Sequence, residues 1–502
     1  MSEKSQIAEF YAFKKILITG ATGFMGKVLV WKLLHSCPKL DTIFVLMRSK
    51  YGKSSLSRRA EFFNSPVFEN FKKDNPKIFQ KVVLISGDVG EDRLGLSDKD
   101  RDMLIDQVSI IFHSAAILKM NADLRTAINV NTAGTIRMLE LAQQVKKLES
   151  FVYISTAYCC CENNRVEEKM YPSKYNPEKI LDLVQWMEPK LLEKITPNLI
   201  NPLPNTYTFS KRLTESLLNE YGSTVPIIVA RPSIVAACYK EPFPGWNDTL
   251  NGPTGFYAAG AKGLLRVTTM RLDNKTNMIP CDFAINSILI LPWANSREQL
   301  LKEISVYNIP QNSYDDLTWR QLLHHYMSSL EKYPVNVALW YPNTNPDTKS
   351  MFVYTIKCIF LHYLPAYIID FILPLVGQKQ FMVRSHDKLA QAETMLRYFT
   401  EKQWSFEHDK VLRLEELLNP TDKQLFPVNM KDMGEFQNYA DDCMASAKFH
   451  IFHESMDHQT RARIMMKIMY VVDKIVVVLR YYILWKFLVF IFNTLRDILV
   501  FN

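Results

Sequence analysis

Cysteine is scarce in this chain of 502 residues, and two other features are missing from it. Eight cysteines in a chain of this length exclude the disulfide framework that holds small secreted domains together. Residues 1–15 contain scattered charges and no apolar run, so we expect no secretory signal peptide. No basic stripe interleaved with aromatic residues is present, and the net charge of +8 is modest. We therefore expect no nucleic-acid partner.

Three of the cysteines, Cys159, Cys160 and Cys161, are consecutive. Adjacent side chains cannot make the spaced clip by which paired cysteines bind a metal ion. We predict small, buried thiols in a reducing compartment and no metal site.

The first half of the chain alternates between short β-rich runs and longer amphipathic stretches such as residues 27–35 and 132–145. With 48% apolar and 22% charged residues, the chain is long enough for two folded domains. Continuous apolar strands covered on both faces by helices are typical of a parallel α/β sheet. We therefore predict a Rossmann-type, doubly wound parallel sheet. The expected strands are residues 16–19, 42–47, 81–85, 109–113, 151–155 and 226–230.

A glycine-rich turn directly follows the first expected strand and opens a helix. Gly20 allows a tight turn, Gly23 lets the backbone approach a pyrophosphate, and Gly26 lets helix and strand pack closely. The N–H groups at the start of the helix favour phosphate binding. This placement predicts a dinucleotide site. Its candidate residues are Gly20, Thr22, Gly23, Phe24, Met25 and Gly26.

The residue at the end of the second strand indicates which dinucleotide binds. An NAD site usually has an acidic residue there, whereas this chain has Arg48, followed by Ser49 and Lys50. A guanidinium can bind a 2′-phosphate with two hydrogen bonds, so we predict NADPH; a solvated cation at a strand end is the alternative. Further candidate cofactor residues follow the other strands: Asp88, Val89, Ala115, Arg231, Pro232 and Ser233.

A tyrosine and a lysine lie four residues apart, at Tyr207 and Lys211, which places them on one face of a helix. An ammonium beside a phenol stabilises the phenolate, so we expect Lys211 to bring the pKa of Tyr207 toward neutrality and to hold the nicotinamide ribose. Ser155 and Thr156 end the fifth strand. A hydroxyl there can hold a carbonyl oxygen while the tyrosine supplies the proton. These four residues are the predicted catalytic set.

The order of these motifs resembles the extended short-chain dehydrogenase/reductase superfamily. The resemblance implies hydride transfer from a nicotinamide to a carbonyl carbon, with Tyr207 protonating the oxygen. Geometry is needed to decide between Ser155 and Thr156 for the carbonyl contact. Related thioester reductases use the threonine, which favours Thr156.

A longer set of motifs resembles the fatty acyl-CoA reductase family over about residues 10–300. It comprises Ile154-Ser155-Thr156-Ala157-Tyr158, Arg231-Pro232-Ser233, Glu241-Pro242-Phe243-Pro244-Gly245-Trp246, Asn251-Gly252-Pro253-Thr254-Gly255 and Ile279-Pro280-Cys281-Asp282. The resemblance implies reduction of a long-chain acyl-CoA to an aldehyde and then to a primary alcohol, using two NADPH. A sterol or sugar-nucleotide dehydrogenase or epimerase, and a reductase that stops at the aldehyde, are the alternatives.

The second half of the chain is expected to be mostly helical, with weaker resemblance to the same family. We divide the chain into an N-terminal segment (residues 1–14), a reductase domain (15–350), a helical C-terminal domain (351–455) and an apolar tail (456–502). The tail contains charged residues, among them Asp473, Lys474, Arg480, Lys486, Arg496 and Asp497, so a membrane-embedded hairpin or single span, an interfacial helix, and a buried helix or partner contact all stay open.

We expect a cytosol-facing intracellular membrane as the location. The endoplasmic reticulum, the peroxisome and the lipid droplet are not distinguished, nor is the acyl chain length. A homodimer is compatible with the superfamily, although no interface pattern is visible in the sequence.

Overall fold

The computed structural model describes residues 3–48, 55–250, 252–298, 304–311, 317–336, 338–343, 346–348, 350–455, 457 and 459–500. The chain forms two compact units, each assembled from three stretches. Unit 1 contains residues 1–248, 273–319 and 395–439, and unit 2 contains residues 249–272, 320–394 and 440–502. The division into four consecutive regions stays a prediction, but the compact units interleave along the chain rather than follow it in order.

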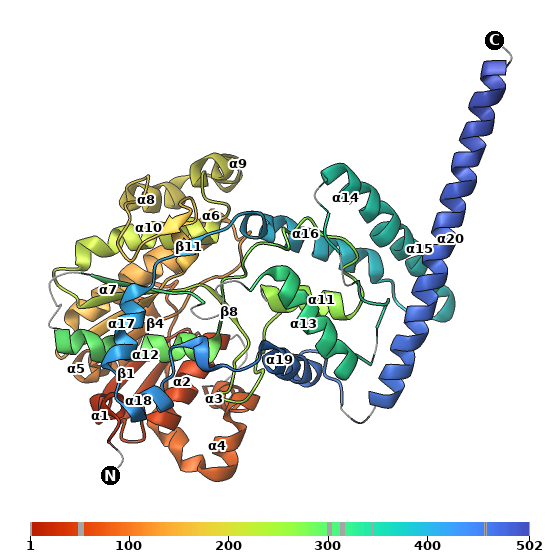
Figure 1. Ribbon diagram of the computed structural model, residues 1–502. Helices are drawn as coiled ribbons and strands as arrows, with labels where there is room; N and C mark the ends of the chain where they lie inside the picture. The colour runs from red at the N-terminus through yellow and green to blue at the C-terminus, as the bar shows by residue number, and fades with distance from the viewer. Residues whose placement is uncertain are drawn as a thin grey trace. The chain divides into compact units, whose positions relative to one another are not determined.

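Unit 1 is built on a seven-stranded, all-parallel sheet with the order β10-β7-β5-β4-β1-β2-β3 (Figure 1). The strand order reverses between β1 and β4, as in doubly wound folds. This confirms the predicted fold class. The strands are β1 (Lys15–Thr19), β2 (Thr42–Met47), β3 (Val82–Ser86), β4 (Ile110–His113), β5 (Ser150–Ile154), β7 (Ile227–Pro232) and β10 (Ser305–Ile309).

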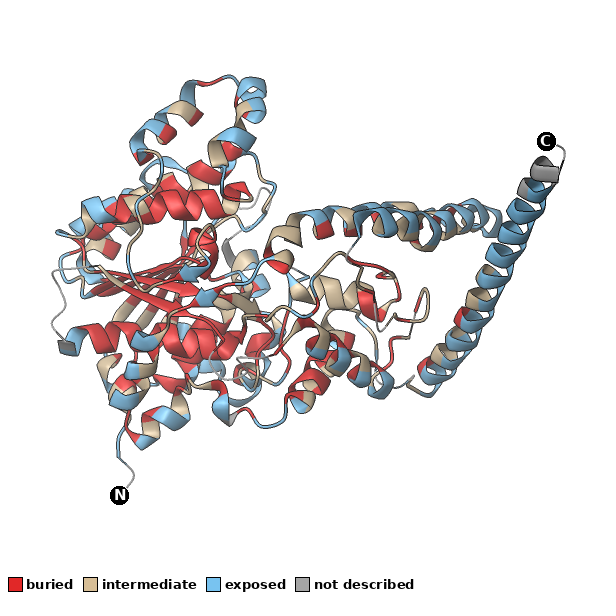
Figure 2. Ribbon diagram, turned by 45° about the horizontal axis from the view of Figure 1, so that its top comes forward, coloured by how far each residue is buried: buried red, intermediate tan, exposed pale blue. Residues whose placement is uncertain are grey.

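Helices cover both faces of this sheet, which explains why its strands are apolar throughout (Figure 2). One face packs against α5 (Asp98–Gln107), α7 (Gly134–Gln144) and α10 (Thr206–Tyr221). On the other side, α2 (Phe24–Ser36) packs against α12 (Cys281–Glu298). The remaining helices of unit 1 are α1 (Gln6–Phe10), α3 (Ser55–Phe63), α4 (Glu69–Asp74), α6 (Leu124–Ala127), α8 (Pro177–Trp186), α9 (Pro189–Ile200), α17 (Asp409–Leu417) and α18 (Pro420–Leu425).

A late stretch of the chain, residues 395–439, belongs to unit 1. Its strand β11 (Ser405–Phe406) pairs with β6 (Arg165–Val166), and the indole of Trp404 donates to the carbonyl of Cys161 at 3.0 Å. The other small sheet pairs β8 (Ile234–Ala236) with β9 (Met278–Pro280). Part of the predicted C-terminal domain is therefore packed on the nucleotide-binding fold.

Unit 2 is helical and has two exposed apolar segments. Its helices are α11 (Pro253–Ala261), α13 (Trp319–Lys332), α14 (Met351–Cys358), α15 (Leu364–Ile372), α20 (Gln459–Val500) and parts of α16 (Met382–Glu401) and α19 (Phe436–His450). Residues Met351–Val376 and Gln459–Thr494 are each long and apolar enough to cross a membrane, by length and composition alone.

The tail is one continuous helix, α20, whose apolar side chains are exposed (Figure 2). A hairpin within the tail and a helix buried in this chain, two of the alternatives left open by the sequence, are therefore wrong. Near its start the helix is anchored by Asp473, whose carboxylate accepts from Arg266 Nη2 and Trp340 Nε1, both at 2.7 Å. A single span, an interfacial helix and a partner contact stay open.

Candidate active site

The glycine turn lies at the point where the strand order reverses. Gly20 has a φ of +72°, and a Cβ atom at this position would lie 2.7 Å from the backbone nitrogen of Ala115, just beyond β4. Only glycine fits there, because the backbone on the other side cannot yield. Helix α2 begins after Gly23, and no side chain caps it. Its first N–H groups are thus available to a phosphate, whereas Ser97 and Asn205 cap α5 and α10.

The other predicted cofactor residues on this side of the sheet follow neighbouring strands. Arg48 is exposed directly after β2, while Ser49 and Lys50 lie outside the described residues. Asp88 is half-buried after β3, and its carboxylate accepts from the N–H of Gly90 at 2.9 Å. Because β1, β2 and β3 are parallel neighbours, these residues share the carboxyl edge of the sheet, as does buried Val89.

Helix α10 brings the predicted catalytic residues together. The side chain of Asn205 caps it by accepting from the N–H of Thr208 at 2.9 Å, which starts the helix one residue before Tyr207. The Tyr207 side chain adjoins that of Thr156, which is buried just after β5, closely enough for the threonine hydroxyl to influence the tyrosine pKa. This contact connects the tyrosine to Thr156 rather than to Ser155. The assignment of catalytic roles stays a prediction.

The Tyr207 phenol does not have the lowered pKa that its spacing from Lys211 suggests. Burial, with a smaller contribution from the nearby Cys159, raises the pKa of Tyr207 well above its usual value, and the neighbouring Thr156 hydroxyl offsets only part of this. The expectation of a lowered pKa was wrong because it treated the phenol as solvated. The phenol is protonated over the whole neutral range.

Lys211 is the group in this site whose charge changes near neutral pH. Its ammonium donates to the carbonyl of Ile154 at 2.7 Å and lies over the ring of Tyr153, 4.6 Å from the centroid. Burial lowers the pKa of Lys211 to about 8, against the opposing charge of Glu215. The side chain is 2% exposed, so its charge depends on these few neighbours.

A buried chain of hydrogen bonds connects the glycine turn to the helix before α7. The hydroxyl of Thr19 accepts from the N–H groups of Ser114 and Ala115, so its own proton faces His113 Nδ1 at 2.8 Å. His113 Nε2–H then donates to Thr135 at 3.1 Å. Burial, with the charge of Lys211, lowers the pKa of His113 to about 3, consistent with this neutral tautomer.

This chain of hydrogen bonds continues to α10 through Asn131. The hydroxyl of Thr135 donates to the carbonyl of Asn131 at 2.7 Å, and the Asn131 amide donates to Ser210 at 2.9 Å. Ser210 precedes Lys211 in α10. The backbone beside the glycine turn and helix α10 are therefore connected by one polar network, which the sequence analysis did not predict.

Arg231 has a structural partner. Its side chain is fully buried and is bound by the carboxylate of Glu215 and by the carbonyl groups of Glu167 and Lys169. Its predicted role at the cofactor site would therefore depend on its backbone. The next two candidates end the strand: Pro232 is the last residue of β7, and the buried hydroxyl of Ser233 has no hydrogen-bond partner among the described residues.

Three acidic or thiol groups cluster beside this arginine. Ligand atoms of Cys159, Cys160 and Glu215 all lie within 4.8 Å of one another. Two guanidinium groups already neutralise this cluster, because Arg231 binds the carboxylate and Arg212 donates to Cys160 Sγ at 2.6 Å. The cluster is thus an internal charge network rather than a set of open ligands.

The proline- and glycine-rich loop at residues 238–248 is fastened beside α2. Lys32 and Lys27 of that helix pair with Glu241 and Asp248 of the loop. The buried carboxylate of Asp282 accepts from three successive loop N–H groups, at residues 239–241. The loop therefore forms a fixed wall next to the helix that follows the glycine turn.

Comparisons with known proteins agree with this arrangement. Two family models described as male sterility protein, the first an NAD-binding region, match residues 18–288 and 361–454. The chain is 36% identical to fatty acyl-CoA reductase 1 of Mus musculus, over 91% of this chain and 88% of that protein. It is 33% identical to the fatty acyl-CoA reductase wat of Drosophila melanogaster, over 86% of this chain and 83% of that protein.

Solved structures share the fold. The terminal R domain from the myxalamid PKS-NRPS biosynthetic pathway has a TM-score of 0.55 at 19% identity, covering 89% of this chain and 96% of that one. The R domain of a non-ribosomal peptide synthetase from Mycobacterium tuberculosis has the same score at 16% identity, with the same coverage of both chains. Given the match over nearly its whole length, the chain belongs to the fatty acyl-CoA reductase family.

Proposed function

We propose that this protein reduces long-chain acyl-CoA to the primary alcohol with NADPH, releasing coenzyme A and passing through the aldehyde. The observation that carries the proposal is that Thr156, just after β5, adjoins Tyr207 on α10, the helix that also presents Lys211. These groups lie at the carboxyl edge of a sheet whose first turn leaves helix N–H groups uncapped. Family membership gives the substrate class.

The residues divide the reduction between binding and proton transfer. Thr156 holds the substrate carbonyl oxygen, and Tyr207 donates its phenolic proton to that oxygen as negative charge develops on it. Lys211 binds the nicotinamide ribose, and its ammonium supplies a positive charge to the site. A bound nicotinamide supplies one hydride per reduction to the carbonyl carbon.

The two reductions balance as follows. In the first, the carbonyl carbon gains a hydride, its bond to sulfur breaks, and the coenzyme A thiolate leaves and takes a proton, which yields the aldehyde. In the second, the aldehyde carbon gains a hydride and its oxygen gains a proton, which yields the alcohol. Two NADPH are oxidised for each acyl-CoA, and Tyr207 must be reprotonated between the steps.

Purified protein with NADPH and palmitoyl-CoA tests this function. We expect one thiol released and two NADPH oxidised for each alcohol formed. One NADPH per thiol, with aldehyde as the product, would instead establish an aldehyde-forming reductase. No thiol release with any acyl-CoA from C12 to C26 would overturn the proposal in favour of a sterol or sugar-nucleotide enzyme on the same fold.

The preference for NADPH is tested at Arg48. Replacing Arg48 with alanine removes a cation that is exposed at the end of β2, and we expect the KM for NADPH to rise by about 10-fold or more, since a charged hydrogen bond contributes roughly 1.5–3 kcal/mol. The KM for NADH should stay within about twofold, because NADH has no 2′-phosphate. Arg165→Ala, which removes an exposed arginine paired with Glu407, is the control. An equal effect on both cofactors would contradict the assignment.

A lipid surface is the proposed partner of the tail, on a cytosol-facing intracellular membrane. In α20 the cations Arg480 and Lys486 interrupt an otherwise apolar, exposed stretch, and their long side chains can extend toward lipid headgroups. Deleting residues 475–502, which leaves the Asp473 anchor in place, should abolish flotation with neutral liposomes while acyl-CoA reduction in detergent persists. Replacing exposed Phe371 and Leu375 with serine tests the other apolar segment separately. Undiminished flotation of the tail deletion would contradict the role of the tail.

A further inference from the structure

A fully buried carboxylate lies on the same helix face as the proposed catalytic pair and has no role in the mechanism above. Glu215 is four residues beyond Lys211 and eight beyond Tyr207 in α10, and its side chain has no exposed surface. Residues four apart are neighbours on one helix face. The three side chains therefore form a single row along the helix.

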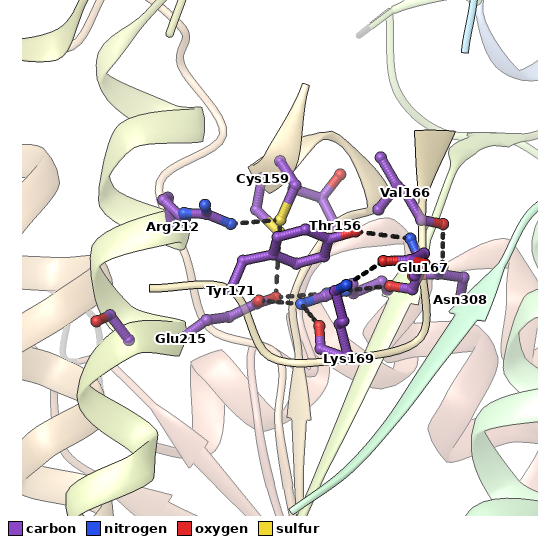
Figure 3. Close-up of polar contacts among 12 residues, drawn as sticks. Thr156, Cys159, Val166, Glu167, Lys169, Tyr171, Arg212, Glu215 and Asn308 are labelled. Atoms are coloured by element: carbon purple, nitrogen blue, oxygen red, sulfur yellow. Dashed lines mark hydrogen bonds and ion pairs between the residues drawn. The ribbon is translucent and has the colours of Figure 1, made fainter. Parts of the chain in front are cut away.

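The carboxylate of Glu215 is held by Arg231 from β7. Arg231 Nε donates to one carboxylate oxygen at 3.0 Å and Nη2 to the other at 2.5 Å. The thiol of Cys159 also donates to it at 3.2 Å (Figure 3). Burial raises the pKa of Glu215, but the charge and hydrogen bonds of Arg231, with the hydrogen bond from Cys159, bring it below the usual value. The carboxylate is therefore ionised at neutral pH.

The side chains around the Glu215–Arg231 pair are also held in place by contacts with Tyr171. The guanidinium groups of Arg212 and Arg231 lie over the ring of Tyr171, 5.2 and 5.8 Å from its centroid. The Tyr171 hydroxyl accepts from the N–H of Glu167 at 2.9 Å (Figure 3). A bidentate buried pair packed in this way cannot reorient easily, so the negative charge stays at one place beside Lys211.

Lys211 has few charged or titratable neighbours. Among the described residues whose charge acts on the Lys211 ammonium, Glu215 is the carboxylate. The carbonyl of Ile154 accepts a hydrogen bond from the ammonium. The groups that face or influence the ammonium come from α10, β5, β4 and the turn after β5: Glu215, Tyr153, His113 and Cys159. Tyr207 lies one turn before Lys211 on the same face of α10. Of these, only Glu215 is anionic at neutral pH, because burial keeps the tyrosine and thiol neutral and His113 is neutral as well.

We propose that Glu215 is a positioning residue of the reductase: its carboxylate, immobilised by Arg231, keeps the buried ammonium of Lys211 protonated. The proposal rests on the proposed function, since it concerns the lysine of that site. It also gives a reason for the buried ion pair, which a fold does not need for stability alone. The i+4 row then contains the proton donor, the cation beside it and the anion that maintains that cation.

Replacing Glu215 with glutamine removes the charge and keeps the size and an acceptor oxygen. The pKa of Lys211 then falls, so the basic limb of the pH profile for acyl-CoA reduction moves to lower pH. A fall of about one unit from a pKa of about 8 lowers the protonated fraction about fivefold at pH 8 and leaves it almost unchanged at pH 6. We therefore expect kcat/KM of Glu215→Gln to be about fivefold lower than that of wild type at pH 8 and almost equal to it at pH 6. A uniform loss of activity at both pH values would overturn the proposal.

Two further variants separate charge from folding. Asp422→Asn removes another fully buried carboxylate of unit 1, which accepts from Ser5 and Gln6. This control should lower thermal stability without moving the basic limb. Glu215→Asp keeps the charge but shortens the side chain by one methylene, which moves the carboxylate away from Lys211. The basic limb of the pH profile should therefore move to lower pH, as in Glu215→Gln, but by a smaller amount. If Glu215→Gln does not fold, an unmoved limb in Glu215→Asp overturns the proposal.

Stability against pH provides a readout that does not depend on activity. Burial depresses the pKa of Lys211 in the folded state, so the unfolded chain binds the extra proton and stability rises as pH increases from about 8 toward the unfolded value of about 10.4. Glu215 stabilises the charged lysine, so this part of its contribution is present below pH 8 and is lost above it. The melting-temperature difference between Glu215→Gln and wild type should therefore shrink from pH 7 to pH 10. A constant difference would overturn the proposal even if wild type reduces no acyl-CoA, a result that would refute the proposed function alone.

Discussion

Replacing Tyr207 with phenylalanine is expected to lower the turnover of acyl-CoA by about 10²- to 10⁴-fold while the Kd for NADPH stays within about twofold. The phenol adjoins Thr156, and its raised pKa keeps it protonated throughout the neutral range. Phenylalanine keeps the ring and removes the proton. Stopped-flow NADPH oxidation measures the turnover, and quenching of tryptophan fluorescence measures cofactor binding.

Tyr11→Phe is the matched control for this substitution. The Tyr11 hydroxyl is also buried in unit 1 and donates to the carbonyl of Leu289 at 2.7 Å, far from the proposed site. This variant also loses one buried phenolic hydrogen bond, which costs about 0.5–1.5 kcal/mol of stability, but its turnover should be unchanged. Equal activity of Tyr207→Phe and Tyr11→Phe would leave the tyrosine of the helix without a catalytic role.

Much of the nucleotide-binding fold could be predicted because its strands are buried on both faces. Six of the seven parallel strands follow from runs of β-branched and apolar residues, with observed bounds within two residues of those expected. The missed strand, β10 at Ser305–Ile309, contains Asn308 in its interior. Its amide is buried and bonds to the carbonyls of Val166 and Glu407, contacts that only tertiary structure supplies.

The candidate site could be predicted where its chemistry depends on spacing within one element. Tyr207 and Lys211 share a helix, and Thr156 follows a strand, so sequence order was sufficient to bring them together. Their pKa values could not be predicted, because burial rather than the nearest charge dominates both. Glu215 is visible in the sequence as an acid four residues after Lys211, but such pairs usually lie on solvated helix faces.

The assembly of each unit from separate stretches was also beyond sequence analysis. Residues 395–439 contribute to unit 1 through a two-residue strand and single side chains such as Trp404 and Asp422. No local periodicity marks such contacts, because each depends on a partner hundreds of residues away. The apolar character of α20 was evident from the sequence. That it forms one continuous helix was not, because its charged residues could equally have marked the ends of shorter membrane-embedded segments.

Replacing Gly26 with alanine is expected to destabilise the dinucleotide turn. A Cβ atom at this position would lie 2.3 Å from the carbonyl oxygen of Gly20 and 2.6 Å from Ala21 Cα. Both contacts are with backbone, so relief requires α2 to move away from the turn. Overpacking of this kind costs about 1–3 kcal/mol or more, which predicts a melting temperature lower by about 2–10 °C and at least about 10-fold weaker NADPH binding.

Gly23→Ala and Gly260→Ala distinguish the turn from a general effect of alanine. At Gly23 an added Cβ meets only the Gly20 carbonyl oxygen, at 3.3 Å, so folding should be nearly unchanged while NADPH binding weakens, because the methyl group intrudes where a pyrophosphate approaches. At Gly260, inside α11, the closest atom would be Met327 Cε at 3.7 Å, and alanine should be neutral or stabilising. Differential scanning fluorimetry with and without NADPH orders the three variants. If Gly26→Ala melted like Gly23→Ala, the close packing of α2 on the turn would not be what requires glycine at position 26.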